Sequence, residues 1–245
     1  MRNIILGLAA ALLIVGGVWY YTQIKPKFTL ELDSRDTIAS WDFQGSHNDG
    51  GELEARVTTE MEKLQAALED EATEPTDYSI YVSMAGQYTL LGDGKNTLKY
   101  LEKALAIDSV KTGLAWHNVG VLMERLGALN TARTAYARAA ESQSQIDAYH
   151  IARFNFLVKH FSEDKEAIDA ALNEAAIEFG EDDRFVMNAR AEWLEIQEEW
   201  QDAIGVWEKI LIVSPEELKS GIRAKIIELQ TSAKNTKNEA THEGQ

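Results

Sequence analysis

Apolar residues recur at helical spacing along most of this chain. Four stretches, starting near Tyr78, Gly113, Ile146 and Arg184, repeat one two-helix pattern at intervals of 33 to 38 residues. A unit of that size cannot bury its own apolar face, so its neighbours must supply the other half of a shared core. The pattern therefore predicts an all-α fold of stacked helix-turn-helix units.

The second copy shows the pattern most clearly. Trp116 opens its first helix, and Gly120 leaves room for close approach of the second helix. Gly127 can adopt the left-handed conformation that ends a helix in a short turn. Ala132 and Tyr136 then lie on the packed face of the second helix. Small and large residues thus alternate where two helices have to fit together.

This pattern resembles the tetratricopeptide repeat family over about residues 78–215. In the first copy the matching positions hold Tyr81, Ala85, Tyr88, Gly92, Leu101 and Ala104. In the fourth copy they hold Met187, Ala191, Leu194, Ala203, Trp207, Ile210 and Pro215. The first copy departs from the family at Thr97, where alanine is usual. The resemblance implies a right-handed α-solenoid of about four units with a concave groove.

The third copy fits the pattern less well. Tyr149 occupies the opening position, but Arg153 lies where a small residue is expected. About three extra residues separate its helices before Ile168. We expect a repeat with an elongated first helix.

The segments around the repeats have their own patterns. We expect a linker at residues 28–51, either two brief strands or an irregular tether, and an amphipathic helix at 52–74. The apolar stripe of that helix has to face the first repeat or a second copy of the chain. The repeat domain, 75–230, ends in a capping helix, and residues 231–245 are polar and predicted to be disordered. The two apolar stripes are formed by Leu53, Val57, Met61, Leu64 and Leu68, and by Leu218, Ile222, Ile226 and Leu229.

Residues 4–21 form an uncharged apolar run of 18 residues. A helix of that length extends about 27 Å, close to the thickness of the hydrocarbon core of a bilayer. Aromatic residues end the run at Trp19, and Lys25 and Lys27 follow. We predict a transmembrane anchor at residues 1–27, with the N-terminus in the cytoplasm and the remaining chain outside it. A cleaved signal peptide is the alternative, because Arg2 provides a basic start.

The chain carries a formal charge of −16, and residues 28–245 carry −19. A field of this sign repels nucleic-acid phosphates and anionic lipid headgroups, so neither is expected as a ligand of the soluble part. It favours basic partners or cations, although a well-solvated acidic surface is the better explanation of the charge. The chain has no cysteine, which excludes disulfides, thiolate metal sites and cysteine nucleophiles.

The sequence contains no motif that predicts catalysis. Nucleophile elbows, phosphate-binding glycine loops, zinc-protease motifs and dinucleotide fingerprints are missing. His47 has acidic neighbours, but their spacing fits no calcium or zinc motif. We therefore expect no enzyme, no metal and no cofactor.

The resemblance implies that the first helices present a groove to a partner. By that analogy the groove residues are His117, Asn118, Val121, Glu124, His150, Phe154, Leu157, Asn188 and Glu192. His117 and His150 occupy equivalent positions, where they could bind a peptide or a metal, sense pH, or simply fill an interface. The basic residues that some relatives use to clamp a carboxylate are missing, so a basic or amphipathic peptide fits better.

We therefore expect a single-pass, membrane-anchored scaffold or adaptor that binds a partner protein in cell-envelope complex assembly. The alternative is a structural membrane protein that self-associates through the 52–72 stripe or the glycines of the anchor.

Overall fold

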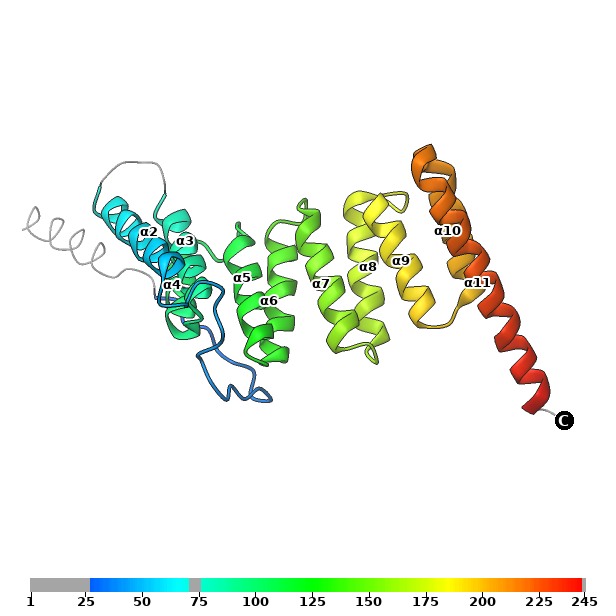
Figure 1. The fold of residues 1–245 in the computed structure, drawn as a ribbon, viewed down its shortest axis with the longest axis horizontal. Coiled ribbons are helices and arrows are strands. Elements are labelled where there is room, and N and C mark those ends of the chain that lie inside the picture. Colours follow the sequence, from blue (N-terminus) through cyan, green and yellow to red (C-terminus); the bar gives the residue numbers. More distant parts are fainter. Residues whose placement is uncertain (1–26, 71–75, 244–245) are drawn as a thin grey trace, which may run out of the picture. The chain divides into compact units, whose positions relative to one another are not determined.

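The computed structural model describes residues 27–70 and 76–243, and this part of the chain is all-helical (Figure 1). Its extended segments form no strand, only an isolated bridge between Asp42 and Asp93. The predicted all-α fold class is thus confirmed. Across the described ranges, no helix is both long and apolar enough to cross a bilayer. The anchor predicted at residues 4–21 lies outside them.

The contacts divide the chain into two compact units, the first ending at Ala135 and the second beginning at Tyr136. Unit 1 contains α2 (Glu52–Glu69), α3 (Asp77–Leu91), α4 (Gly94–Ile107), α5 (Leu114–Arg125) and the start of α6 (Leu129–Ser142). Unit 2 contains the end of α6, α7 (Asp147–His160), α8 (Lys165–Phe179), α9 (Arg184–Ile196), α10 (Trp200–Val213) and α11 (Glu216–Glu243).

Successive helices within each unit pack as neighbours. In unit 1, α3 packs against α4 and α4 against α5. In unit 2, α7 packs against α8, α8 against α9, α9 against α10 and α10 against α11. The first helices of successive pairs also touch, α3 with α5 and α7 with α9. Such nearest-neighbour packing is consistent with an α-solenoid arrangement inside each unit.

Short turns join the helices of the first two pairs, and each contains one left-handed glycine. Gly92 ends α3 with a φ of 82°, and Gly127 follows α5 with a φ of 77°. Glycine adopts this conformation without steric cost. Asp93 then caps α4 by accepting a hydrogen bond from the backbone N–H of Asn96 at 2.9 Å. The turn residues therefore follow the sequence pattern.

The third pair accommodates its three extra residues in two places. Helix α7 has 14 residues where α5 has 12, and the turn at 161–164 has one residue more than the turn at 126–128. Arg153, where the pattern expected a small residue, is mostly buried along its stem and forms an ion pair with Glu174 of α8. The large side chain thus reaches past the helix contact to a partner on the neighbouring helix.

Helix α2 packs against α3, so its apolar stripe faces the first helix pair of its own chain. Val57 is 2% exposed, and Met61 and Leu64 are half-buried, whereas Leu53 stays at the edge with 36% of its surface exposed. Of the two expected partners for this stripe, the structure provides the first repeat.

The C-terminal end differs from the prediction of disorder at 231–245. Helix α11 continues to Glu243. Its apolar stripe extends beyond Leu229 to Ala233, which is 6% exposed, and Trp200 donates a hydrogen bond from Nε1 to Thr236 Oγ1 at 3.2 Å. The polar composition of this segment gave no sign that two further turns of α11 contact the rest of unit 2.

The predicted linker is an ordered strap, which we define as residues 27–48, laid along unit 1 (Figure 1). Its backbone joins the turn between α3 and α4 through three hydrogen bonds of 2.9 to 3.0 Å: Phe43 N–H to Gly92 O, Gly94 N–H to Trp41 O, and His47 N–H to Leu90 O. Close approach requires glycine on both sides. A Cβ on Gly45 would lie 2.2 Å from Leu90 O, and one on Gly92 would lie 2.0 Å from Phe43 O.

The strap also caps a helix that is remote in sequence. The Asp36 carboxylate accepts hydrogen bonds from the backbone N–H groups of Asn130 and Thr131 at 3.1 and 2.7 Å, and from both their side chains. These N–H groups lie in the first turn of α6, where they have no partner within the helix. The hydrogen bonds hold the pKa of Asp36 below its ordinary value, against the opposing effect of burial.

Candidate partner-binding groove

In unit 2, the first helices of two successive pairs, α7 and α9, form a groove between them with a volume of about 470 Å³. Its lining consists of Asp147, Ile151, Phe154, Asn155, Asp183, Arg184, Phe185, Asn188, Ala189 and Glu192. On α7, Asp147, Ile151 and Phe154 follow one another at intervals of four and three. On α9, Arg184, Asn188 and Glu192 follow at intervals of four, so each set lies on a single face of its helix. Phe154 is 2% exposed and forms part of the floor, while Asn188 and Glu192 are exposed at the rim.

The groove has more negative than positive charge. Three carboxylates line it, those of Asp147, Asp183 and Glu192, against the single guanidinium of Arg184. Asp183 is partly committed to local structure, because it caps α9 by accepting hydrogen bonds from Phe185 N–H and Val186 N–H at 2.8 and 3.3 Å. Asp147 and Glu192 therefore supply the negative charge that a ligand would meet at the two walls.

A second hollow of about 300 Å³ continues this surface toward α11. Arg184 and Asn188 line both hollows, and Leu218, Ile222 and Lys225 of α11 line the far side. Lys225 is held there by Glu195, whose carboxylate also accepts a hydrogen bond from Trp207 Nε1 at 2.6 Å. Because Trp207 and Ile210 of α10 also line this hollow, the surface available in unit 2 involves four helices, α7, α9, α10 and α11.

Three of the five residues predicted for the groove in unit 2 line it: Phe154, Asn188 and Glu192. Leu157 is 2% exposed and belongs to the core. His150 is 5% exposed; its Nε2 lies 3.0 Å from Ser144 O, and its ring packs edge-on against Phe179 at 5.2 Å between centroids. Burial lowers the pKa of His150. Neither residue lines the groove: the His150 side chain packs against Phe179 of α8, and Leu157 is buried in the core.

The sequence analysis missed several groove residues, most clearly Asp147, Ile151 and Arg184. Each precedes a predicted residue that lines the groove: Ile151 lies three and Asp147 seven positions before Phe154, and Arg184 lies four positions before Asn188. Extending the helical register backward along each first helix would have found them.

Unit 1 has a smaller groove, about 150 Å³, between α3 and α5. Of the predicted residues, Asn118 and Val121 line it, whereas His117 and Glu124 are half-buried and outside its lining. Burial lowers the pKa of His117. Phe43 of the strap lines the same groove, and the Arg125 guanidinium lies over the Phe43 ring at 4.8 Å. The chain's own strap therefore takes up part of the space that a ligand would need.

The lining of the α7–α9 groove determines which side chains it can accept. The described residues contain no cluster of three or more His, Cys, Asp or Glu side chains with metal-binding proximity. What the α7–α9 groove offers is an apolar floor with acidic walls, which can accept an apolar side chain and pair with a cation. No protein-family model matches the chain, and no curated protein matches it either.

Proposed function

We propose that this chain is a membrane-anchored adaptor that binds a basic, amphipathic segment of a partner protein in the α7–α9 groove. The observation that carries the proposal is the combination of a 470 Å³ groove, a floor containing Phe154, and walls bearing Asp147 and Glu192. An amphipathic helix or peptide could place an apolar residue on that floor and Lys or Arg beside the carboxylates.

Unit 2 is the better binding surface of the two. The groove in unit 1 has about a third of the volume and includes Phe43 of the strap in its lining. A partner would have to displace Phe43 to enter it, whereas the α7–α9 groove is lined only by the first helices and the N-cap of α9. We therefore assign the primary contact to Phe154, Asn188 and Glu192.

The wider proposal follows from the sequence. The resemblance to tetratricopeptide repeats supports a right-handed solenoid, and the apolar run at 4–21 supports a single-pass anchor with the repeats outside the cytoplasm. In that location the chain would recruit a partner during assembly of a cell-envelope complex. The alternative, self-association through the 52–72 stripe, is weakened because α2 packs against its own α3.

The binding proposal is testable with peptides of defined charge. Full-length protein in a mild detergent should bind amphipathic peptides rich in Lys more tightly than matched peptides rich in Glu, as measured by fluorescence anisotropy. Glu192→Lys should weaken binding of the basic peptides by roughly tenfold, because it replaces an attraction at the groove wall with a repulsion.

Glu208→Lys is the matched control. Glu208 is exposed on α10 and outside the groove, so this variant makes the same change in net charge. Equal weakening by both variants would mean that peptides respond to overall charge alone, and the groove assignment would fail. Loss of residues 2–21 should release the protein from membranes without altering peptide affinity, which tests the anchor separately.

A further inference from the structure

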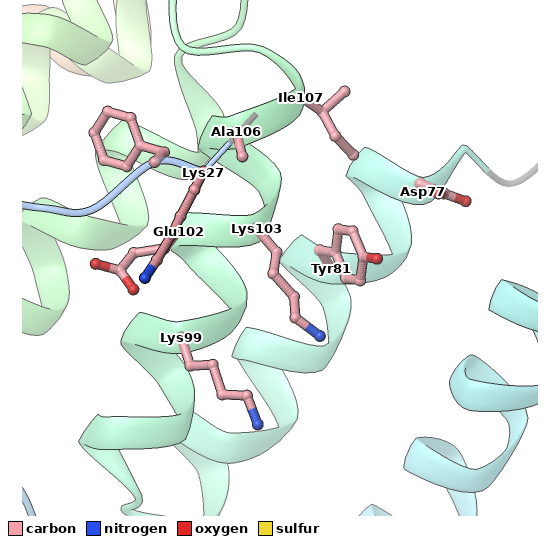
Figure 2. A pocket seen from close by; sticks show the side chains of 9 residues that line it. Lys27, Asp77, Tyr81, Lys99, Glu102, Lys103, Ala106 and Ile107 are labelled. Atoms are coloured by element: carbon pink, nitrogen blue, oxygen red, sulfur yellow. The ribbon is translucent and has the colours of Figure 1, made fainter. Parts of the chain in front are cut away.

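A further cavity in unit 1 lies beside the first residues of the strap, and none of its lining residues lines the groove between α3 and α5. It has a volume of about 710 Å³ and is lined by Lys27, Phe28, Asp77, Tyr81, Lys99, Glu102, Lys103, Ala106 and Ile107 (Figure 2). This volume is within the range of cavities that hold small organic ligands. Three segments build it: the strap, the start of α3, and the outer face of α4.

The pocket is locally basic in an acidic protein. Three lysines and two carboxylates line it, whereas residues 28–245 together carry −19. Glu102 is partly engaged in structure, since its Oε1 accepts a hydrogen bond from the Leu30 N–H at 2.8 Å. A ligand entering the pocket therefore meets a concentration of ammonium groups that the general surface does not have.

The lysines of α4 are spaced and positioned to act together. Lys99 and Lys103 lie four residues apart, and their side chains extend in the same direction from the helix (Figure 2). The Lys103 ammonium lies 4.6 Å from the centre of the Tyr100 ring and 5.1 Å from that of Tyr81. Aromatic faces attract an ammonium without removing its charge, so the two rings help to fix the position of the Lys103 ammonium.

The remaining lining is apolar. Phe28, the Tyr81 ring, Ala106 and Ile107 provide it, and Ile107 is 52% exposed. Phe28 is itself held in place, because it packs edge-on against Trp116 at 5.5 Å. A ligand suited to this pocket carries a negative group for the lysines and an apolar body for these side chains. Lysine ammonium groups are well suited to phosphate oxygens.

We propose that this pocket binds a phosphate-bearing amphiphile, with the phosphate at Lys27, Lys99 and Lys103 and the apolar part against Phe28 and Ile107. The charge argument is independent of the proposed function. The source of the ligand rests on the proposed anchor: Lys27 follows Tyr21 by six residues, a reach of at most about 20 Å, which brings a phospholipid headgroup within range of the pocket. A soluble organophosphate has the same chemistry.

Native mass spectrometry of the full-length protein released from a neutral detergent tests this assignment. We expect one molecule of dioctanoyl phosphatidylglycerol to bind per chain, at least tenfold more tightly than dioctanoyl phosphatidylcholine. Lys99→Gln combined with Lys103→Gln should weaken phosphatidylglycerol binding at least tenfold. Equal affinity for the two lipids would overturn the proposal, as would unchanged binding by that double variant.

The matched control is Lys95→Gln combined with Lys111→Gln. It removes the same charge from two exposed lysines of unit 1 that do not line the pocket, and it should change binding less than twofold. If the first double variant fails to fold, judged by circular dichroism, Lys27→Gln combined with Lys99→Gln replaces it, because the ring contacts of Lys103 then remain. No loss of binding in that folded variant would also overturn the proposal.

A competition arm identifies the source of the phosphate. If millimolar glycerol 3-phosphate displaces phosphatidylglycerol, the pocket accepts a soluble organophosphate; if it does not, the acyl chains are needed and the ligand is a lipid. Both results support the shared chemistry. The anchor proposal would fail separately, if fractionation showed that the protein does not associate with membranes. The groove proposal would fail if Glu192→Lys left peptide binding unchanged.

Discussion

Glu198 adopts a left-handed backbone conformation, with a φ of 60°, in the turn between α9 and α10. Glycine occupies the corresponding turn position in the first two copies, at Gly92 and Gly127. Left-handed backbone costs a non-glycine residue roughly 1 to 2 kcal/mol, partly offset by the greater chain entropy that glycine loses on folding. Glu198→Gly should therefore raise the free energy of unfolding by about 1 kcal/mol in urea titrations. Glu199→Gly, at a negative φ of −80°, should give no gain; equal effects would contradict this explanation.

His117, which is half-buried, and His150, which is buried, make stability depend on pH. Burial lowers the pKa of both His117 and His150 below the ordinary value of 6.5; for His150, Arg153 adds to this effect while Ser144, Glu174 and Glu178 oppose it. The unfolded chain then takes up a proton near pH 6.5 that the folded chain takes up only at lower pH. Stability is therefore fully present above about pH 6.5 and falls as the pH drops below it, by at most about 1.4 kcal/mol per pH unit for each histidine.

Urea unfolding at pH 7.5 and 5.5, followed by tryptophan fluorescence, checks this dependence. His150→Gln should lower stability at pH 7.5 yet reduce the loss between the two pH values, since the titrating group is gone. His47→Gln is the control, because His47 is partly exposed in the strap. If the His150→Gln protein kept the full wild-type pH dependence, the pKa of this histidine would not change on folding and the explanation would fail.

At the scale of elements, the strap and α6 stabilise each other through Asp36. Removing a charged cap costs roughly 1 to 2 kcal/mol, because the N–H groups of the first turn lose their acceptor. Asp36→Ala should lower the stability of unit 1 by about that amount and make proteolysis within residues 27–48 faster. Mass spectrometry of the fragments measures the cleavage rate. Asp42→Ala removes the same charge from an exposed position of the strap and should have little effect. Similar cleavage rates in the two variants would rule out the capping role.

At the scale of the whole molecule, the two units divide the surfaces between them. Unit 1 holds the strap, a groove that shares its lining with Phe43, and the basic pocket at the start of the strap. Unit 2 holds the open acidic groove and the closing helix α11. A ligand of the basic pocket and a basic peptide would therefore bind to different units and have opposite charge preferences. The binding of each ligand can therefore be tested with variants that leave the other site unchanged.

The helices and their turns could be predicted from the sequence because both depend on local interactions. Apolar residues at a spacing of three and four mark the buried face of a helix wherever it packs, and Gly92 and Gly127 fit a left-handed turn in any fold. The resemblance to tetratricopeptide repeats placed Phe154, Asn188 and Glu192 on the first helices, where they line the α7–α9 groove. These features need no knowledge of distant residues.

The tertiary structure alone decided the features that join residues far apart in sequence. The strap has no helical periodicity, and its position depends on the close fit of Gly45 to the turn at Gly92 and on the hydrogen bonds of Asp36 to the start of α6. His150 shares its repeat position with His117, yet Phe179 and Ser144 enclose it. The basic pocket likewise forms only when Lys27 comes to lie beside α4. The spacing of apolar residues indicates which face of a helix is buried, but only tertiary packing decides which segment of the chain covers that face.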